Sequence, residues 1–204
     1  MTDREEQMAA AYAAIGRYIV EFEQLIHWLR MWAVFSLTMA GLKNQGMAWA
    51  IVNSRAMNAQ SLLALIQSFM AELELYSKES NPDGTKILDH FYKLVTNCME
   101  ERNKIVHGTW HIGWGNEFTT DWSKMDGFKG NPKKTGGGLV ENLNTTPGEL
   151  LEKCEEVERT VLLTQRMYVV TTFPTTTGKI EDNFSFDDGR LVASRPPKSA
   201  SPTT

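Results

Sequence analysis

The stretch FYKLVTNCMEERNKIVHG, residues 91–108, decides the expected fold, because its apolar residues recur at helical spacing. At 3.6 residues per turn, one face of a helix over 91–106 collects Phe91, Leu94, Val95, Cys98, Ile105 and Val106. Arg102 lies near the centre of this apolar stripe. Because a guanidinium cannot shed its proton, an arginine there requires a partnering anion or an opening into a polar cleft or interface.

The end of this helix gathers three polar residues. Asn103 and His107, four residues apart, share a second face, and Gly108 is expected to end the helix as a left-handed residue after the C-cap. A cation, an amide and a titratable imidazole are the groups that phosphodiester cleavage needs. A simpler interpretation stays open, in which His107 only caps backbone carbonyls.

Arg102 also has a simpler interpretation, namely a salt bridge to a neighbouring helix. Glu23, on the inner flank of the first helix's stripe, is the best candidate for that partner. The ion pair and a catalytic role are compatible, because a paired arginine is also an oriented one. The expected site therefore contains Arg102, Asn103 and His107, with Glu23 in a supporting role.

The rest of the chain is predicted to be mainly helical. Residues 5–39 and 47–77 carry apolar residues at helical spacing, and Asn81-Pro82-Asp83-Gly84 separates the second pattern from a third helix that starts near Thr85. Thr146-Pro147-Gly148-Glu149 is a capping sequence that opens a fourth long helix. We therefore expect an all-α fold, an antiparallel bundle of four to five helices.

A short β-hairpin is expected after the third long helix, because the apolar period changes from helical to two beyond Gly108. The alternating residues, on either side of the turn signal Gly115-Asn116, are Trp110, Ile112, Trp114, Phe118 and Trp122. The three tryptophans, Trp110, Trp114 and Trp122, either stack on nucleobases or pack the hairpin onto the bundle. His111 sits between apolar positions, so its side chain is expected on the opposite face.

A flexible loop rich in glycine and lysine is expected to follow the hairpin up to Gly138, so that hairpin and loop together occupy about residues 109–145. Its lysines outnumber its acidic residue, Asp126, and give a local positive charge that can follow an RNA backbone. These candidate RNA contacts are Lys124, Lys129, Lys133 and Lys134. An ordinary solvated loop is the alternative.

Length and composition predict one helical domain over residues 1–173 and a disordered Thr-, Ser- and Pro-rich tail over 174–204. Cys98 and Cys154 both fall on apolar stripes, which favours buried free thiols and a reducing cytoplasm. The longest apolar run, residues 31–42, is too short for a bilayer span, so we expect a soluble cytoplasmic protein without a membrane partner. No cofactor or metal motif is present.

The string R-N-x-x-x-H at residues 102–107 resembles the Rx4-6H signature of the HEPN superfamily (higher eukaryotes and prokaryotes nucleotide-binding), in which a polar residue, often Asn, follows the Arg. Its place at the end of the third long helix also agrees with that family. The resemblance covers the architecture of about residues 5–172, and the motif is its specific part.

This resemblance implies a metal-independent endoribonuclease that acts as a homodimer, with two copies of the motif in one cleft. RNA would be cut by attack of its own 2′-hydroxyl, while Arg102 stabilises the phosphoryl charge, His107 moves protons and Asn103 orients the phosphate or the imidazole. By analogy the protein would be a toxin or defence effector, restrained by an antitoxin or another regulatory protein.

Two alternatives to a nuclease remain. One is a non-catalytic helical module of the same family that binds a nucleotide or a protein partner in the same cleft. The other is a general helical scaffold in which Arg102 and His107 are structural. The net charge of −4 argues against general nucleic-acid binding, so any RNA contact must depend on a local basic region.

Overall fold

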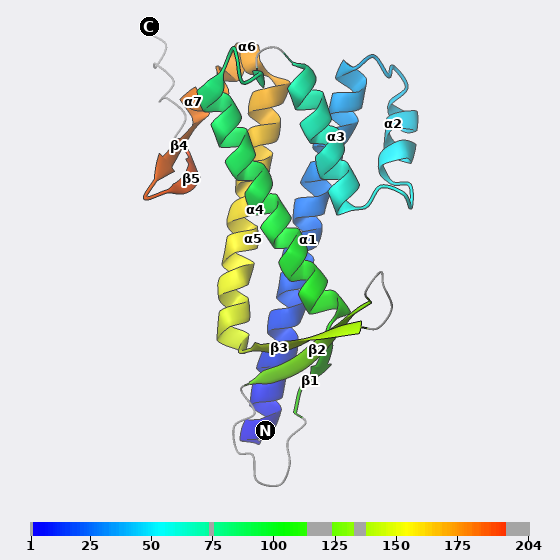
Figure 1. Ribbon diagram of the computed structural model, residues 1–204, viewed down its shortest axis with the longest axis vertical. Coiled ribbons are helices and arrows are strands. Elements are labelled where there is room, and N and C mark those ends of the chain that lie inside the picture. The colour runs from blue at the N-terminus through cyan, green and yellow to red at the C-terminus, as the bar shows by residue number, and fades with distance from the viewer. Residues whose placement is uncertain (1, 74–75, 114–123, 133–137, 195–204) are drawn as a thin grey trace, which may run out of the picture. The chain divides into compact units, whose positions relative to one another are not determined.

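The computed structural model describes residues 2–73, 76–113, 124–132 and 138–194, and it is mainly helical with small antiparallel sheets (Figure 1). It divides the chain into two compact units instead of the single domain predicted over residues 1–173. The first unit comprises Met1–Leu25 and Asn97–Arg159, and the second comprises Ile26–Thr96 and Thr160–Thr204. Because three long helices contribute residues to both units, a contiguous stretch of sequence could not reveal this division.

Three long helices follow the predicted pattern. Helix α1 spans Asp3–Met39, α4 spans Pro82–His107 and α5 spans Pro147–Thr172. At the start of α5 the Glu149 N–H donates to the Thr146 hydroxyl at 3.2 Å, and the Glu149 carboxylate accepts from the Thr146 N–H at 2.9 Å. This reciprocal pair is the capping arrangement expected from the sequence.

The helical pattern over residues 47–77 is not one helix, as predicted, but two. Helix α2 spans Gln45–Val52 and α3 spans Ala59–Glu72. The side chain of Asn58 accepts from the Ser61 N–H at 2.9 Å, so it satisfies a backbone donor in the first turn of a new helix. The Asn58 cap therefore stabilises the start of a new helix, whereas the apolar spacing alone predicts one continuous helix through this position.

The first unit contains a three-stranded antiparallel sheet in the order β1-β2-β3, instead of the predicted hairpin and flexible loop (Figure 1). Strand β1 spans Thr109–His111, β2 spans Met125–Pro132 and β3 spans Gly138–Thr145. The predicted turn and three of its aromatic residues lie outside the described residues; those aromatics are Trp114, Phe118 and Trp122.

Gly127 explains why this region resembled a loop in the sequence. In β2 the backbone pairs with β1 and β3 on both sides, and a Cβ added at Gly127 would lie 2.7 Å from the Thr109 carbonyl oxygen and 2.9 Å from the Trp110 ring. The glycine is therefore needed for close packing within a central strand, not for loop flexibility.

The core of the first unit forms where α1, α4, α5 and the sheet bury apolar side chains. Tyr18 and Phe22 of α1 are 1% and 3% exposed, and Met125 of β2 is fully buried. Cys98 and Cys154 are buried free thiols, as the sequence predicts, and burial raises the pKa of the Cys154 thiol. Apolar burial of this kind supplies the main favourable free energy of folding.

The second unit includes residues that the sequence predicted to be disordered. Helix α6 spans Pro174–Thr177, α7 spans Ile180–Asn183, and β4 (Phe184–Asp187) pairs with β5 (Arg190–Ala193) in a hairpin. Ile180 and Leu191 are fully buried and Phe184 is 2% exposed. The prediction of a disordered tail is therefore wrong for residues 174–194, and residues 195–204 lie outside the described part of the chain.

The error has a physical reason. Ile180, Phe184 and Leu191 follow neither a helical nor a strand period, because a helical turn and a hairpin separate them. A polar contact also fixes this segment, since Arg166 of α5 donates to the Asn183 side chain at 2.5 Å and Asn183 donates to the Thr177 carbonyl at 2.7 Å. Short elements held by such contacts have no periodic signature in the sequence.

None of the helices in the described ranges combines the length and apolar character that a transmembrane segment requires.

The C-terminal hairpin should contribute to stability through Leu191. We expect Leu191→Ala to lower the free energy of unfolding by about 2–5 kcal/mol, because it leaves a cavity at a fully buried position. Val192→Ala, at a partly exposed neighbour, is the control and should cost less. Thermal melts monitored by circular dichroism would measure both variants. Equal melting temperatures for the parent and Leu191→Ala would contradict a docked hairpin.

Candidate functional site

The structure brings together the three polar residues predicted at the end of α4. The Arg102 Nη1 atom lies 3.3 Å from His107 Nε2 and donates to the Asn103 Oδ1 atom at 3.5 Å. Arg102 is half-buried, whereas Asn103 and His107 are exposed. The site therefore presents a guanidinium, an amide and an imidazole at an accessible surface.

The contact between Arg102 and His107 orients the imidazole. A guanidinium only donates hydrogen bonds, so Nε2 is the nitrogen that can accept from it in this contact. The Nε2 lone pair is the group that can take a proton from a substrate hydroxyl. If a phosphate drew the guanidinium away, that lone pair would become free.

Arg102 is held by an aromatic ring and not by the predicted carboxylate. Its guanidinium carbon lies 5.8 Å from the centroid of the Phe22 ring, within the range of a cation–π interaction, and Phe22 is 3% exposed. The predicted salt bridge with Glu23 is absent, and Arg102 has no ion pair with any carboxylate in the described ranges. Consecutive residues of a helix point about 100° apart, so Glu23 is exposed while Phe22 faces inward.

The end of α4 is fixed by close packing against the sheet. The Trp110 indole N–H donates to the Ile105 carbonyl at 2.8 Å, which satisfies a backbone acceptor of the last helical turn. A Cβ added at Gly108 would lie 2.6 Å from the Lys104 carbonyl oxygen and 2.7 Å from Leu143 Cδ1. The predicted left-handed conformation of Gly108 is wrong, since its φ is not positive, and small size is what this position requires.

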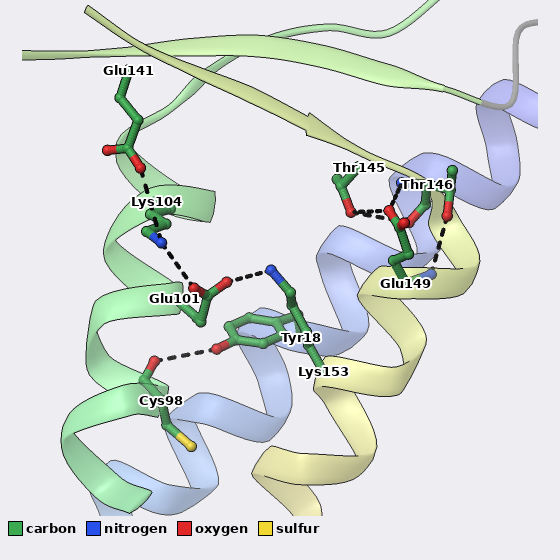
Figure 2. Close-up of polar contacts among 9 residues, drawn as sticks. All are labelled: Tyr18, Cys98, Glu101, Lys104, Glu141, Thr145, Thr146, Glu149 and Lys153. Atoms are coloured by element: carbon green, nitrogen blue, oxygen red, sulfur yellow. Dashed lines mark hydrogen bonds and ion pairs between the residues drawn. The ribbon is translucent and has the colours of Figure 1, made fainter. Parts of the chain in front are cut away.

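An ion network also holds helix α4 (Figure 2). Glu101 accepts hydrogen bonds from Lys104 at 3.0 Å and from Lys153 of α5, and Lys104 lies 3.9 Å from Glu141 of β3. Burial acts to raise the pKa of Glu101, but the hydrogen bonds from Lys153 and Lys104 outweigh it and lower that pKa below its ordinary value. The residue before Arg102 is therefore bound directly to α5 and is linked to β3 through Lys104.

Tyr18 adds a contact from α1 to the same helix (Figure 2). Its hydroxyl donates to the Cys98 carbonyl at 3.2 Å, and burial raises the pKa of the Tyr18 hydroxyl. Val106, predicted on the buried stripe, is instead 36% exposed, because the helix ends at the next residue and no further turn packs over it. An apolar side chain is thus exposed in the turn that carries the site.

Two of the four predicted RNA-contacting lysines lie in the described residues. Lys124 is exposed just before β2, and Lys129 lies within β2 opposite Glu141. Neither contacts Arg102 or His107 in the described part of the chain. Lys133 and Lys134 lie outside the described residues. In the described ranges, no group of three or more His, Cys, Asp or Glu side chains is arranged to hold a metal ion.

Sequence reasoning missed three residues that position the site: Phe22, Trp110 as a helix cap, and Lys153. Phe22 belongs to the apolar pattern over residues 5–39 and Trp110 to the alternating pattern beyond Gly108, but such a pattern predicts which face a residue lies on and not which residue it contacts. Lys153 lies 52 residues from Glu101, and no local pattern joins two residues at that separation.

Comparisons with known proteins give no match: no family model, curated protein or solved structure is similar to this chain.

Glu101 should stabilise the fold in a pH-dependent way. At neutral pH, Glu101→Gln should lower the free energy of unfolding by about 1 kcal/mol, since the lysine partners are partly exposed. Because the folded pKa of Glu101 is lowered, its stabilisation is present above the ordinary glutamate pKa and is lost as pH falls through the folded pKa.

The stability difference between the parent and Glu101→Gln should therefore be largest near neutral pH and shrink in acid. Urea unfolding across the acid and neutral range would measure it, with Glu155→Gln on the exposed side of α5 as the control. A difference that stays constant down to the most acidic pH would show that the carboxylate charge does not contribute.

Proposed function

We propose that this chain is a metal-independent endoribonuclease of HEPN type. The observation that carries the proposal is the accessible pairing of Arg102 with His107, in which the cation has no carboxylate partner among the described residues. A guanidinium that is held in place but not neutralised attracts an anion, and a phosphodiester is an anion that matches its fork of donors. The adjacent imidazole supplies the proton carrier that cleavage requires.

The proposed reaction uses the 2′-hydroxyl of RNA as nucleophile. His107 Nε2 takes the proton of that hydroxyl as its oxygen attacks the neighbouring phosphorus, and the bond from phosphorus to the 5′-oxygen breaks. Arg102 donates to the phosphoryl oxygens, on which negative charge increases in the transition state. Asn103, exposed beside them, orients the phosphate or the imidazole. The products are a 2′,3′-cyclic phosphate and a 5′-hydroxyl.

A second copy of the chain would complete the site. The leaving 5′-oxygen needs a proton, whereas the contacts around Arg102 in the described residues include one imidazole. A two-fold dimer that places the α4 ends together would supply a second His107 as the acid. Val106, 36% exposed between the two site residues, provides an apolar contact at such an interface. A role as a toxin or defence effector, with a restraining antitoxin, follows from the HEPN resemblance alone.

Cleavage should be lost with His107 and should not depend on a metal. We expect the purified protein to cut labelled RNA in EDTA, to leave the same sequence made as DNA intact, and to form cyclic phosphate ends. His107→Ala should lower the rate by ~10²- to 10⁴-fold, as is typical of losing a general acid or base. His27→Ala, at an exposed histidine of α1, is the matched control and should cut like the parent.

Arg102 can be tested without the risk of exposing a buried carboxylate, because Glu23 does not pair with it. Arg102→Lys keeps the charge but loses the two-pronged geometry, so it should cut more slowly than the parent. Arg17→Ala, at a solvent-exposed arginine paired with Glu158, is the control. If folded His107→Ala cuts RNA as fast as the parent, the nuclease proposal fails and the non-catalytic binding module replaces it.

The dimer makes a separate prediction. Sedimentation should give the mass of two chains at micromolar concentration, and Val106→Asp should give monomers that cut RNA poorly, because a charge replaces an apolar contact. Leu162→Asp, at a 64% exposed residue of α5 in the second unit, should stay dimeric. A parent that sediments as a monomer and still cuts RNA would exclude the shared site.

A further inference from the structure

The outer face of the three-stranded sheet carries an aromatic pair among polar side chains. In the register of the sheet, Thr109, Phe128 and Asn142 form one row across the three strands, and His111, Asp126 and Asn144 form the next. Paired residues of antiparallel strands point to the same face. The inward row between them, Trp110, Gly127 and Leu143, packs toward the core.

Phe128 is the centre of this outer face. It lies on the middle strand and is 41% exposed, and its ring stacks with the His111 ring at 5.8 Å between centroids and 29° between planes. Its neighbours in the row are an exposed threonine and an exposed asparagine, which do not cover a ring. A large apolar ring in the middle of a mostly polar sheet face has no role in the core.

The polar side chains of this face match the edges of nucleobases. Asn142 and Asn144 are exposed amides that both donate and accept hydrogen bonds, and Asp126 accepts from an exocyclic amine. A hollow of about 260 Å³ lies at the end of β2 and β3, lined by Lys124, Asp126 and Asn144 and, where β3 leads into α5, by Thr145, Thr146 and Glu149. The Glu149 carboxylate accepts hydrogen bonds from the Thr145 hydroxyl and the Thr146 N–H, so it is engaged in the cap of α5. Among the described residues of this lining, Lys124 is the one cation that can meet a backbone phosphate.

The face also lies next to the proposed cleavage site. Strand β1 begins at Thr109, two residues after His107, and Thr109 is paired with Phe128. The Cα atoms of Phe128 and His107 are separated by two residues of chain and one strand spacing, which is about 13 Å at most. One or two nucleotides can cover such a distance, so a base on Phe128 and a phosphate at His107 can belong to one strand.

We propose that this sheet face is a binding platform for single-stranded RNA, on which Phe128, backed by His111, stacks one base. The hollow at Lys124, Asp126 and Asn144 takes a neighbouring nucleotide. The inference rests on the proposed nuclease function and names its substrate class: RNA with unpaired bases, since a base inside a duplex cannot stack on a protein ring. The face also carries Val140, which is 67% exposed and paired with Gly130 one row beyond Phe128. A protein partner still fits less well, because the two rows around the ring consist mainly of amides, a carboxylate, an imidazole and a hydroxyl group.

Binding can be measured apart from cleavage. Fluorescence anisotropy of a labelled single-stranded RNA of about 10 nucleotides should be recorded with His107→Ala, so that the probe stays intact. In that background Phe128→Leu, which keeps an apolar side chain but removes the ring, should weaken binding roughly tenfold, and Phe128→Tyr should bind like the parent. Leu139→Ala, at a 56% exposed residue on the opposite face of the sheet, is the control and should bind normally.

Further measurements separate this inference from the proposed function. Unlabelled single-stranded RNA should displace the probe better than the matching duplex. With His107 intact, Phe128→Leu should raise KM for cleavage and leave kcat nearly unchanged, because the ring holds substrate and does not touch the reacting atoms.

Equal affinity of folded Phe128→Leu and parent would overturn the platform, even if the parent cuts RNA. Loss of the dimer in Phe128→Leu would also overturn it and would make the face a protein interface. If Phe128→Leu weakens RNA binding but the parent does not cut RNA, the platform proposal is supported and the nuclease proposal fails. A chain that neither binds nor cuts RNA would exclude both.

Discussion

The positive charge of Arg102 is held by an aromatic ring, an amide and an imidazole, without a carboxylate partner among the described residues. The Phe22 ring contacts the Arg102 guanidinium without occupying its N–H donors, whereas a carboxylate at the same place would accept hydrogen bonds from them. A cation–π interaction acts through the ring and does not use the N–H donors, so these donors can still turn toward a ligand. The guanidinium is therefore held in one orientation and can still bind an anion.

The surroundings of Arg102 keep the end of α4 in one position. Glu101 ties the helix to α5 through Lys153, Lys104 ties it to β3, and the Trp110 indole binds back to the last turn. Because Gly108 has no side chain, Leu143 of the sheet packs directly against the end of α4. These contacts come from three other elements, α5, β1 and β3, so the position of His107 does not depend on the helix end alone, which would otherwise fray.

The sequence predicts most of the long helices and the grouping of the site residues, but it does not predict which residues contact one another across the fold. The stripe that contains Phe91 and Ile105, the breaks before α4 and α5, and the grouping of Arg102 with His107 can be read from spacing and capping residues. The break at Asn58 could not, because an asparagine cap looks like any surface amide. The strands around Gly127 could not, because a glycine required by packing looks like a flexible one. Ile180, Phe184 and Leu191 lie too close to turns to show any period.

The division of the chain into two units has a consequence for the order in which a ribosome produces it. All residues of the first unit precede Thr160, whereas the second unit needs the hairpin that ends at Ala193. The residues of the site and of the sheet are therefore synthesised before the buried part of the other unit is complete. A nascent chain, or a product terminated after α5, contains every described residue of the site while Phe184 and Leu191 are still missing.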